Sequence, residues 1–173
     1  MRAKWPERRK RRDYGVTAEE IVRRGTEEFD PSFEALKGAV EEACGRETEW
    51  EAKVVAGIGA VIAFSLEDVA AARALTVCAG ALATNGDDPE GQVLAHFSGL
   101  LEDVAPREML FPISSAEGIV ETGAIMIRGH LLAGSAESLP ALGPELVYLT
   151  LMPYLGLAGA KQWAAVFRLA VYP

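Results

Sequence analysis

The sequence predicts an all-α fold, a helical bundle with about six main helices in one domain. Half of the 173 residues are hydrophobic but only 8% are aromatic, because Ala, Leu and Val supply most of the apolar content. Apolar residues recur at helical spacing along most of the chain, and β-branched runs with a period of two are few. Between the apolar stretches stand helix-start patterns, in which Ser, Thr or Asp precedes Glu or Pro.

Four helices are expected in the first half of the chain. A capping-box pattern predicts a short helix over residues 17–24, which Gly25 ends. An Asp-Pro pair then predicts a second helix over residues 30–44. Apolar spacing indicates two further helices, over residues 49–65 and 66–82, before a loop marked by Asn-Gly and Asp-Pro pairs.

Three helices are expected in the second half. Another Asp-Pro pair starts one over residues 88–104, and a second capping box, Ser114 with Glu117, starts one over 114–134. The last covers residues 139–156, where Pro153 is expected to bend or end the helix. The seventeen residues that follow either form a further short helix or stay extended.

The helix expected over residues 139–156 is apolar on almost every side. It reads LPALGPELVYLTLMPYLG, and Glu145 is its one charged residue. A helix that is apolar all round has to be buried in a core or against a partner. A chain of this length offers little interior for such a helix, so the stretch indicates a subunit interface.

Charge divides the chain into a basic start and an acidic body. Residues 1–12 hold seven basic groups and one acidic group, a net charge of +6, whereas the other 161 residues carry a net charge of −14. Residues 1–28 are therefore interpreted as a basic, disordered arm followed by a short helix. The arm is either a phosphate-contacting segment or a solvated tail, and the acidic body is a poor binder of polyanions.

The sequence contains few groups for catalysis, metal binding or membrane insertion. Cys44 and Cys78 are predicted to be buried reduced thiols, because they lack metal or redox spacing. His96 and His130 are each either a core histidine, a polar anchor for a ligand or a pH-sensitive group. We expect no catalytic residues, cofactor or metal. The apolar run after Lys53 is too short to cross a bilayer and no secretory leader is present, so we expect a cytoplasmic protein without membrane contact.

The order of these helices resembles the C-terminal regulatory domain of TetR-family transcriptional regulators. The segments that carry the resemblance are the helix entry at 29–36, the runs at 50–64 and 70–77, and the final pair at 114–134 and 139–156. The resemblance implies a regulatory domain over residues 29–156 and a C-terminal extension over 157–173. It also implies an effector-binding protein that is not an enzyme.

The resemblance further implies a homodimer and a cavity for a small apolar effector. In that family the last two helices of two subunits pack as a four-helix bundle. The implied interface residues are Ile119, Gly123, Ile127, Leu142, Leu146, Leu149, Met152 and Pro153. The implied cavity-lining residues are Phe64, Cys78, Leu82, Phe97, Leu101, Phe111, Met126 and His130.

The DNA-binding region of the family does not carry over to this chain. A three-helix region would precede Phe29, but the 28 residues there do not have its pattern. The first hypothesis is therefore an effector-sensing, homodimerising domain without a complete DNA-binding head. The alternatives are a DNA-binding repressor whose helix-turn-helix lies upstream of a mis-called start, and a small-molecule enzyme that uses the cavity.

Overall fold

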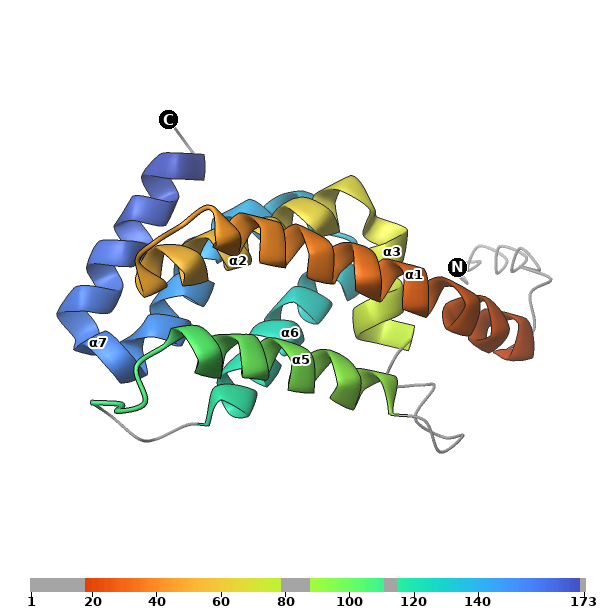
Figure 1. The fold of residues 1–173 in the computed structure, drawn as a ribbon. Helices are drawn as coiled ribbons and strands as arrows, with labels where there is room; N and C mark the ends of the chain where they lie inside the picture. The colour runs from red at the N-terminus through yellow and green to blue at the C-terminus, as the bar shows by residue number, and fades with distance from the viewer. Residues whose placement is uncertain (1–17, 79–87, 111–114, 172–173) are drawn as a thin grey trace, which may run out of the picture.

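The computed structural model describes residues 18–78, 88–110 and 115–171, and side chains over 27–76, 88–110 and 115–170 (Figure 1). These residues form α1 (Ala18–Gly45), α2 (Trp50–Glu67), α3 (Val69–Arg73), α5 (Pro89–Val104), α6 (Ala116–Leu132) and α7 (Leu139–Val171). A π-helical turn, η1 (Ala74–Cys78), continues α3, and a 3-10 turn, η3 (Ala136–Ser138), precedes α7. No strand occurs in the described ranges, and the all-α prediction with about six helices is confirmed.

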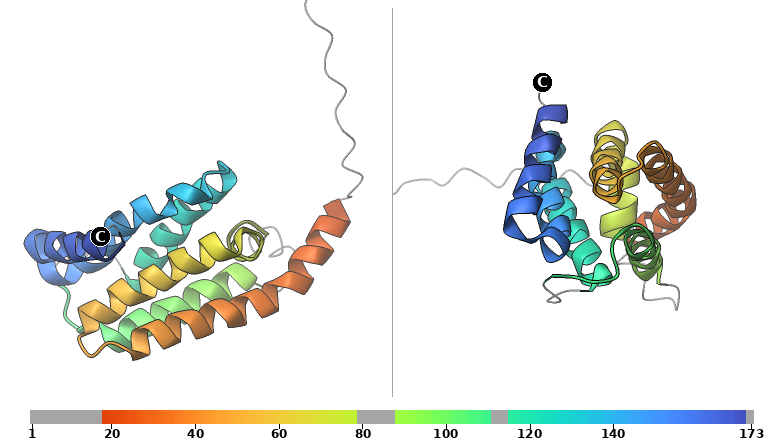
Figure 2. Two further views of the ribbon diagram at one scale, coloured as in Figure 1. Left: turned by 90° about the horizontal axis from the view of Figure 1, so that it is seen from above. Right: turned by 60° about the vertical axis from the view of Figure 1, so that its left-hand side comes forward.

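The helices form two groups around the interior. Figure 2 shows α1 and α2 running alongside one another, with α6 and α7 on the other side. Helix α1 packs mainly on α2, α5 packs on α6, and α7 packs on α2. Because each helix covers part of the same interior, residues from every part of the described chain can line one site.

Helix α1 is continuous where the sequence predicted two helices. It runs through Gly25 and through Pro31, which was expected to start a new helix. On either side of the proline, Phe29, Leu36 and Val40 are almost fully buried in one cluster. Their spacing keeps a single helical face buried. This tertiary burial explains why the helix tolerates the loss of the backbone hydrogen bond that proline cannot donate.

The starts of three later helices follow their capping residues. Asp88 accepts a hydrogen bond from the Gly91 amide at 2.9 Å, with Pro89 at the first helical position as predicted. Asp68 caps α3 in the same way. Helix α6 is capped by Ser115, whose hydroxyl accepts from the Gly118 amide at 3.1 Å. The start predicted at Ser114 was therefore wrong by one residue, and Ser114 itself lies outside the described residues.

Helix α7 consists of two arms joined at Gly156. Neither Pro144 nor Pro153 ends the first arm, residues 139–155, so of the bend or end predicted at Pro153 the end does not occur. The break is at Gly156, where φ is 69° and ψ is 179°. Only glycine adopts this region without strain. The second arm, residues 157–171, is helical, which resolves the alternative between helix and extended chain.

The second arm packs back on the first and belongs to the core. Its residues Ala160, Ala164 and Phe167 are buried. The Phe167 ring lies so close to Gly143 in the first arm that a Cβ at Gly143 would overlap it. The residues expected to be an extension therefore supply part of the interior, and the sequence boundary at 156 corresponds to a kink inside one packed unit.

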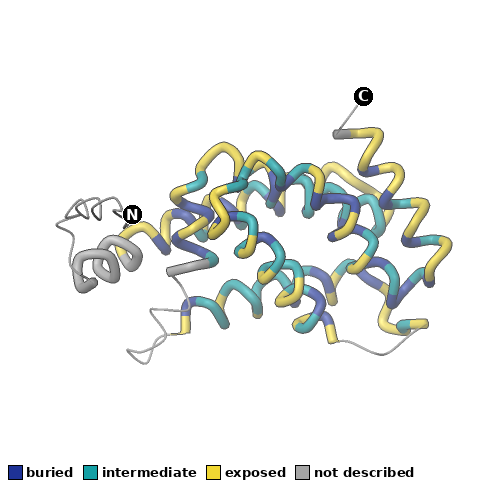
Figure 3. The backbone as a smooth tube through the Cα atoms, turned by 180° about the vertical axis from the view of Figure 1, so that it is seen from behind, coloured by how far each residue is buried: buried dark blue, intermediate teal, exposed yellow. Residues whose placement is uncertain are grey.

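The apolar interior is divided into two clusters. The larger cluster combines residues of α2, α5, α6 and α7, including the fully buried Leu131, Leu139 and Leu151. The smaller cluster combines Phe29, Leu36 and Val40 of α1 with Leu75 of η1. Figure 3 shows the buried positions on the inward faces of the helices. A cavity lies between side chains of these two clusters.

One helical stretch has the length and apolar composition of a membrane span. It covers Ala136–Ala170, and a second candidate exists only if α2 and the helix after it, which meet at 111°, count as one bent span. The first stretch contains the kink at Gly156, and its inward residues pack in the core. The core helix of a soluble protein has the same properties, so one such stretch is weak evidence for a span.

A candidate ligand-binding cavity

An apolar cavity of about 220 Å³ lies at the centre of the described structure. Every described α-helix and the turn η1 contribute to its wall. Close packing is the rule in protein interiors, and an apolar void of this size costs stability unless something fills it. The cavity is therefore the first candidate for a functional site.

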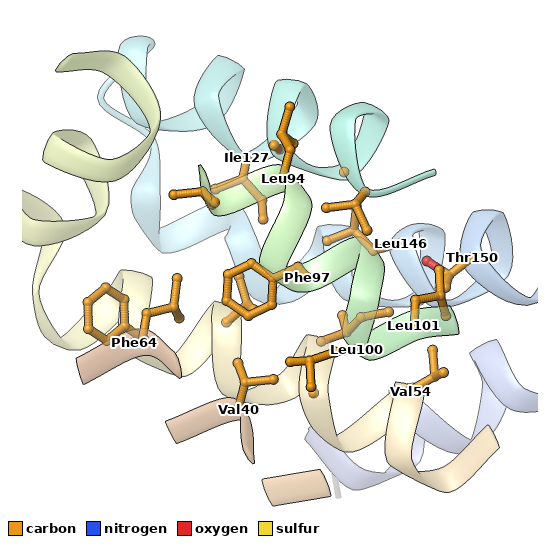
Figure 4. Close-up of a pocket in the computed structure, with 18 of the residues that line it drawn as sticks. Val40, Val54, Phe64, Leu94, Phe97, Leu100, Leu101, Ile127, Leu146 and Thr150 are labelled. Carbon is orange, nitrogen blue, oxygen red and sulfur yellow. The ribbon is translucent and has the colours of Figure 1, made fainter. Parts of the chain in front are cut away.

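The wall consists mainly of aliphatic and aromatic side chains (Figure 4). Helices α1 and α2 contribute Leu36, Val40, Val54, Ile58, Val61 and Phe64. Helices α5 and α6 contribute Val93, Leu94, Phe97, Leu100, Leu101, Val104, Ile119, Val120 and Ile127. Leu75 of η1 and Leu146 of α7 complete the apolar wall. A guest inside would be held chiefly by the hydrophobic effect and dispersion.

Three polar groups in the wall already donate to backbone carbonyls. The Ser65 hydroxyl donates to the Val61 carbonyl at 2.7 Å, and the Thr76 hydroxyl donates to the Ala72 carbonyl at 2.7 Å. The Cys44 thiol donates to the Lys53 carbonyl at 3.3 Å. The remaining polar wall residues are Glu41, the Lys53 side chain and Thr150.

Cys44 is a half-buried free thiol. Burial raises the pKa of the Cys44 thiol above its usual value, and the nearby Lys53 charge opposes this shift only in part. A thiol with a raised pKa stays protonated at neutral pH, and the thiolate is the reactive form. Cys44 is a free cysteine, as predicted, but it is half-buried and not fully buried.

Three of the eight predicted cavity residues line the cavity. They are Phe64, Phe97 and Leu101. Met126 is half-buried against the larger cluster, and neither it nor His130 is part of the wall. Leu82 and Phe111 lie outside the described residues. The backbone of Cys78 ends η1, but its side chain lies outside the described set.

His130 instead joins α6 to the turn before α7. Its Nδ1 atom lies 2.6 Å from the Ser138 hydroxyl, and that hydroxyl donates to the Ser135 carbonyl. Since the hydroxyl has one proton, Nδ1 of neutral His130 must carry a proton and donate to Ser138. The Ser135 hydroxyl bonds back to the His130 carbonyl, so these groups fix the connection between the two helices.

The cavity reaches the surface near Glu41, at the seam between α1 and α5. Glu41 lines the cavity while its side chain is 54% exposed. Across the seam its Oε1 atom lies 3.8 Å from Nε2 of His96, whose ring stacks edge-on against Phe33 and Phe97. Burial, with help from Lys37, lowers the pKa of His96 despite the opposing charges of Glu41 and Glu34.

The predicted interface residues lie mostly inside the subunit. Ile119, Ile127, Leu142, Leu146 and Pro153 are buried within one chain, and Gly123 lines the cavity. Met152 is half-buried, while Leu149 is 37% exposed. Because α6 and α7 are apolar on both faces, the face that carries most of these predicted interface residues can pack into the core of the subunit.

Other residues of α6 and α7 carry the apolar surface. Six of the eight exposed large apolar side chains lie on these two helices, namely Ile125, Leu132, Leu149, Leu157, Val166 and Leu169. A shallow hollow, lined in part by Tyr148 and Arg168, lies between the two arms of α7. Exposed apolar side chains concentrated on neighbouring elements are typical of an interaction surface.

Comparison of the chain with protein-family models, curated proteins and solved structures finds no match. Within the described ranges, no group of three or more His, Cys, Asp or Glu side chains could hold a metal ion. The all-α fold and the apolar cavity therefore define the protein as a helical domain with a candidate small-molecule site. Its relation to the TetR family remains a resemblance.

Several wall residues escaped the sequence analysis. Val40, Val54, Leu94 and Leu146 are ordinary members of helical apolar faces, and nothing in the spacing separates a cavity wall from a packed core. Thr150 was detectable in principle, because it is a polar residue within the most apolar helix of the chain.

Proposed function

We propose that this protein is an effector-sensing, homodimeric regulatory domain of the TetR type, which binds a small, largely apolar molecule. The observation that supports the proposal most directly is the central cavity, whose wall is apolar and is shared by all the described helices. An apolar wall with a few polar groups is the usual composition of a small-molecule site.

The position of α1 in the wall supplies a route from binding to regulation. Leu36, Val40 and Cys44 of α1 line the cavity, and Figure 2 shows the first turns of α1 extending beyond the other helices. A ligand that prefers one position of α1 over another would shift the balance between them. The projecting end of α1 would carry that shift away from the cavity.

The proposed dimer uses the outward faces of α6 and α7. Residues 117, 121, 125, 129 and 132 form an exposed stripe on α6, and residues 141, 145 and 149 form one on the first arm of α7. Most exposed apolar side chains of the described chain belong to these two helices. Burying them against a second copy would remove this area from water.

A thermal-shift titration with 1-octanol tests the ligand-binding proposal. Binding to the folded state should raise the melting temperature in proportion to the logarithm of ligand concentration above Kd. Ala124→Phe places a ring at the cavity wall and should abolish the shift, whereas Ala165→Phe on the exposed side of α7 should leave it unchanged. Equal shifts in a folded Ala124→Phe variant and in the wild type would contradict the proposal.

A second candidate, a DNA-contacting regulator, is supported by the charge of residues 1–12, a net of +6 immediately before α1. Electrostatic contacts with phosphates would give an affinity that falls steeply with salt. Fluorescence anisotropy with a short DNA duplex, before and after deletion of residues 1–12, tests this candidate. An affinity unchanged by the deletion would exclude the basic segment as the contact.

A further inference from the structure

Two of the polar wall residues, Lys53 and Thr150, lie toward one end of the cavity. The rings of Trp50 in α2 and Tyr154 in α7 are in edge-on contact, with centroids 5.6 Å apart. Lys53 follows Trp50 by one turn, and Thr150 precedes Tyr154 by one turn, so both lie just inside this contact. Lys53 and Thr150 both line the cavity.

Lys53 and Thr150 retain unused hydrogen-bonding capacity. Within the described part of the chain, the half-buried Lys53 side chain forms no ion pair and the Thr150 hydroxyl has no hydrogen-bond partner. By contrast, the hydroxyls of Ser65 and Thr76 donate to carbonyls of their own helices. A cationic side chain that lines an apolar cavity without a counter-charge favours an anionic guest.

The other end of the cavity is apolar. Phe64 lies eleven residues beyond Lys53 on α2, a distance of about 16 Å along the helix axis. Leu75 of η1 and Ile127 of α6 also belong to the wall. Figure 4 shows Phe64 and Thr150 at opposite sides of the cavity. A guest that matches both ends has an apolar body and one polar terminus.

Glu41 is the competing charge at the cavity mouth. Its carboxylate is 54% exposed and has His96 as its neighbour at 3.8 Å. Solvent screens an exposed carboxylate, so a cationic guest would gain less there than an anion would gain beside the less exposed Lys53. The wall therefore favours a carboxylate over an ammonium group.

We propose that the cavity binds a slender amphipathic carboxylate, whose aliphatic body lies toward Phe64 and whose carboxylate accepts hydrogen bonds from the Lys53 ammonium and the Thr150 hydroxyl. This inference rests on the proposed function and specifies the ligand class of the same site. A cavity of about 150 Å³ holds benzene. The 220 Å³ here is suited to a somewhat larger guest, such as a medium-chain fatty acid.

Calorimetric titration with three molecules that share one aliphatic tail tests the inference. Octanoate should bind more tightly than 1-octanol, and octylammonium should bind most weakly. Lys53→Met keeps the length of the side chain without its charge, and should weaken octanoate binding by about tenfold to a hundredfold. It should change the affinity for 1-octanol by less than about twofold, since the apolar contacts remain.

Two further variants separate the polar contacts from indirect effects. Thr150→Val preserves the shape of the side chain and should weaken octanoate binding by about tenfold. Lys161→Met removes an exposed charge from the second arm of α7, away from the cavity, and should have no effect.

The possible outcomes distinguish this inference from the proposed function. Equal affinity for octanoate and 1-octanol, or octanoate binding that is unaffected by Lys53→Met, would overturn the inference and leave the cavity as a ligand site. Tightest binding of octylammonium would assign recognition to Glu41 and also overturn it. Failure of all three molecules to bind would contradict the proposed function as well.

Discussion

At the scale of single residues, the position of the Phe167 ring requires a residue without a side chain at Gly143. Its ring lies against Gly143 of the first arm of α7, and a Cβ built at Gly59 of α2 would lie 3.8 Å from its Cε2 atom. Gly143 thus permits the two arms of α7 to meet at this ring, whereas a Cβ at Gly59 would make only an ordinary van der Waals contact with it. This packing attaches the second arm of α7 to the body of the protein.

Gly143→Ala should therefore destabilise the fold. The added methyl group would overlap the Phe167 ring, and overpacking of this kind costs about 1–3 kcal/mol. Urea denaturation would measure the change in the free energy of unfolding. Gly38→Ala is the matched control, because its Cβ meets open space on the exposed side of α1 and should stabilise the protein by up to about 1 kcal/mol.

His96 should make stability depend on pH. Its pKa is lowered in the folded state, chiefly by burial, so the folded protein favours the neutral ring. Its contribution is fully present above the unfolded pKa of about 6.5 and is lost as the pH falls toward the folded pKa. Melting temperatures should therefore drop more between pH 7 and pH 5, a range of about two units, in the wild type than in His96→Gln.

Glu41→Gln should change the acid sensitivity of stability in the direction opposite to His96→Gln. The Glu41 charge raises the pKa of His96, so its removal should lower that pKa further and enlarge the loss of stability in acid. A wild-type pH profile that is parallel to that of His96→Gln would show that the ring contributes nothing to the acid response.

At the scale of elements, α6 and α7 have two roles that the apolar pattern alone does not separate. Leu146 faces the cavity, whereas Leu149, less than one turn later, is 37% exposed. A charge at Leu146 would disrupt the subunit itself. Substitutions at the exposed positions of these helices therefore test dimer formation without disrupting the subunit.

Ile125→Glu combined with Leu149→Glu should convert the proposed dimer to a monomer. The two carboxylates would be desolvated at the interface, which costs several kcal/mol. Sedimentation velocity at micromolar concentration would measure the state, with circular dichroism to verify folding. Leu110→Glu, at a 64% exposed position between α5 and α6, should remain dimeric. A monomeric wild type, or equal dissociation of this control, would contradict the assigned interface.

At the scale of the whole molecule, the cavity couples α1 to the rest of the bundle. The wall includes residues of α1 and of the first arm of α7, but none from residues 157–171. A guest would add contacts between the two apolar clusters. The second arm of α7 would gain no direct contact.

Hydrogen exchange should therefore report an uneven response to a bound guest. Amides of α1 between residues 36 and 45 should exchange more slowly with saturating 1-octanol, because local opening there breaks contacts with the guest. Amides of residues 157–171 should slow less and serve as the internal reference. Equal protection of the two segments would argue against α1 as the responsive element.

The sequence was sufficient for much of the local structure. Helical spacing predicted the all-α class, and Asp88 with Pro89 correctly marked the start of α5. The same local rules failed at Pro31, where burial of the surrounding helix outweighs the lost hydrogen bond. Local patterns predict helix starts well when the cap makes its hydrogen bond within one turn.

The candidate site was predictable only in part. Phe64, Phe97 and Leu101 were expected to line one cavity and all three line this one, but Lys53 and Thr150 were not associated with each other. They lie almost a hundred residues apart in sequence, and the antiparallel pairing of α2 with α7 brings them to the same end of the cavity. No local spacing encodes that pairing.

The sequence by itself determined that this chain forms helices and that its last helices have more apolar surface than one face needs. The tertiary structure decided which of those faces points inward. It also placed the kink of α7 at Gly156, where glycine alone adopts the backbone conformation without strain. Helical periodicity is a local property of the backbone, whereas a cavity and a free surface depend on which distant helices fill the space beside each face.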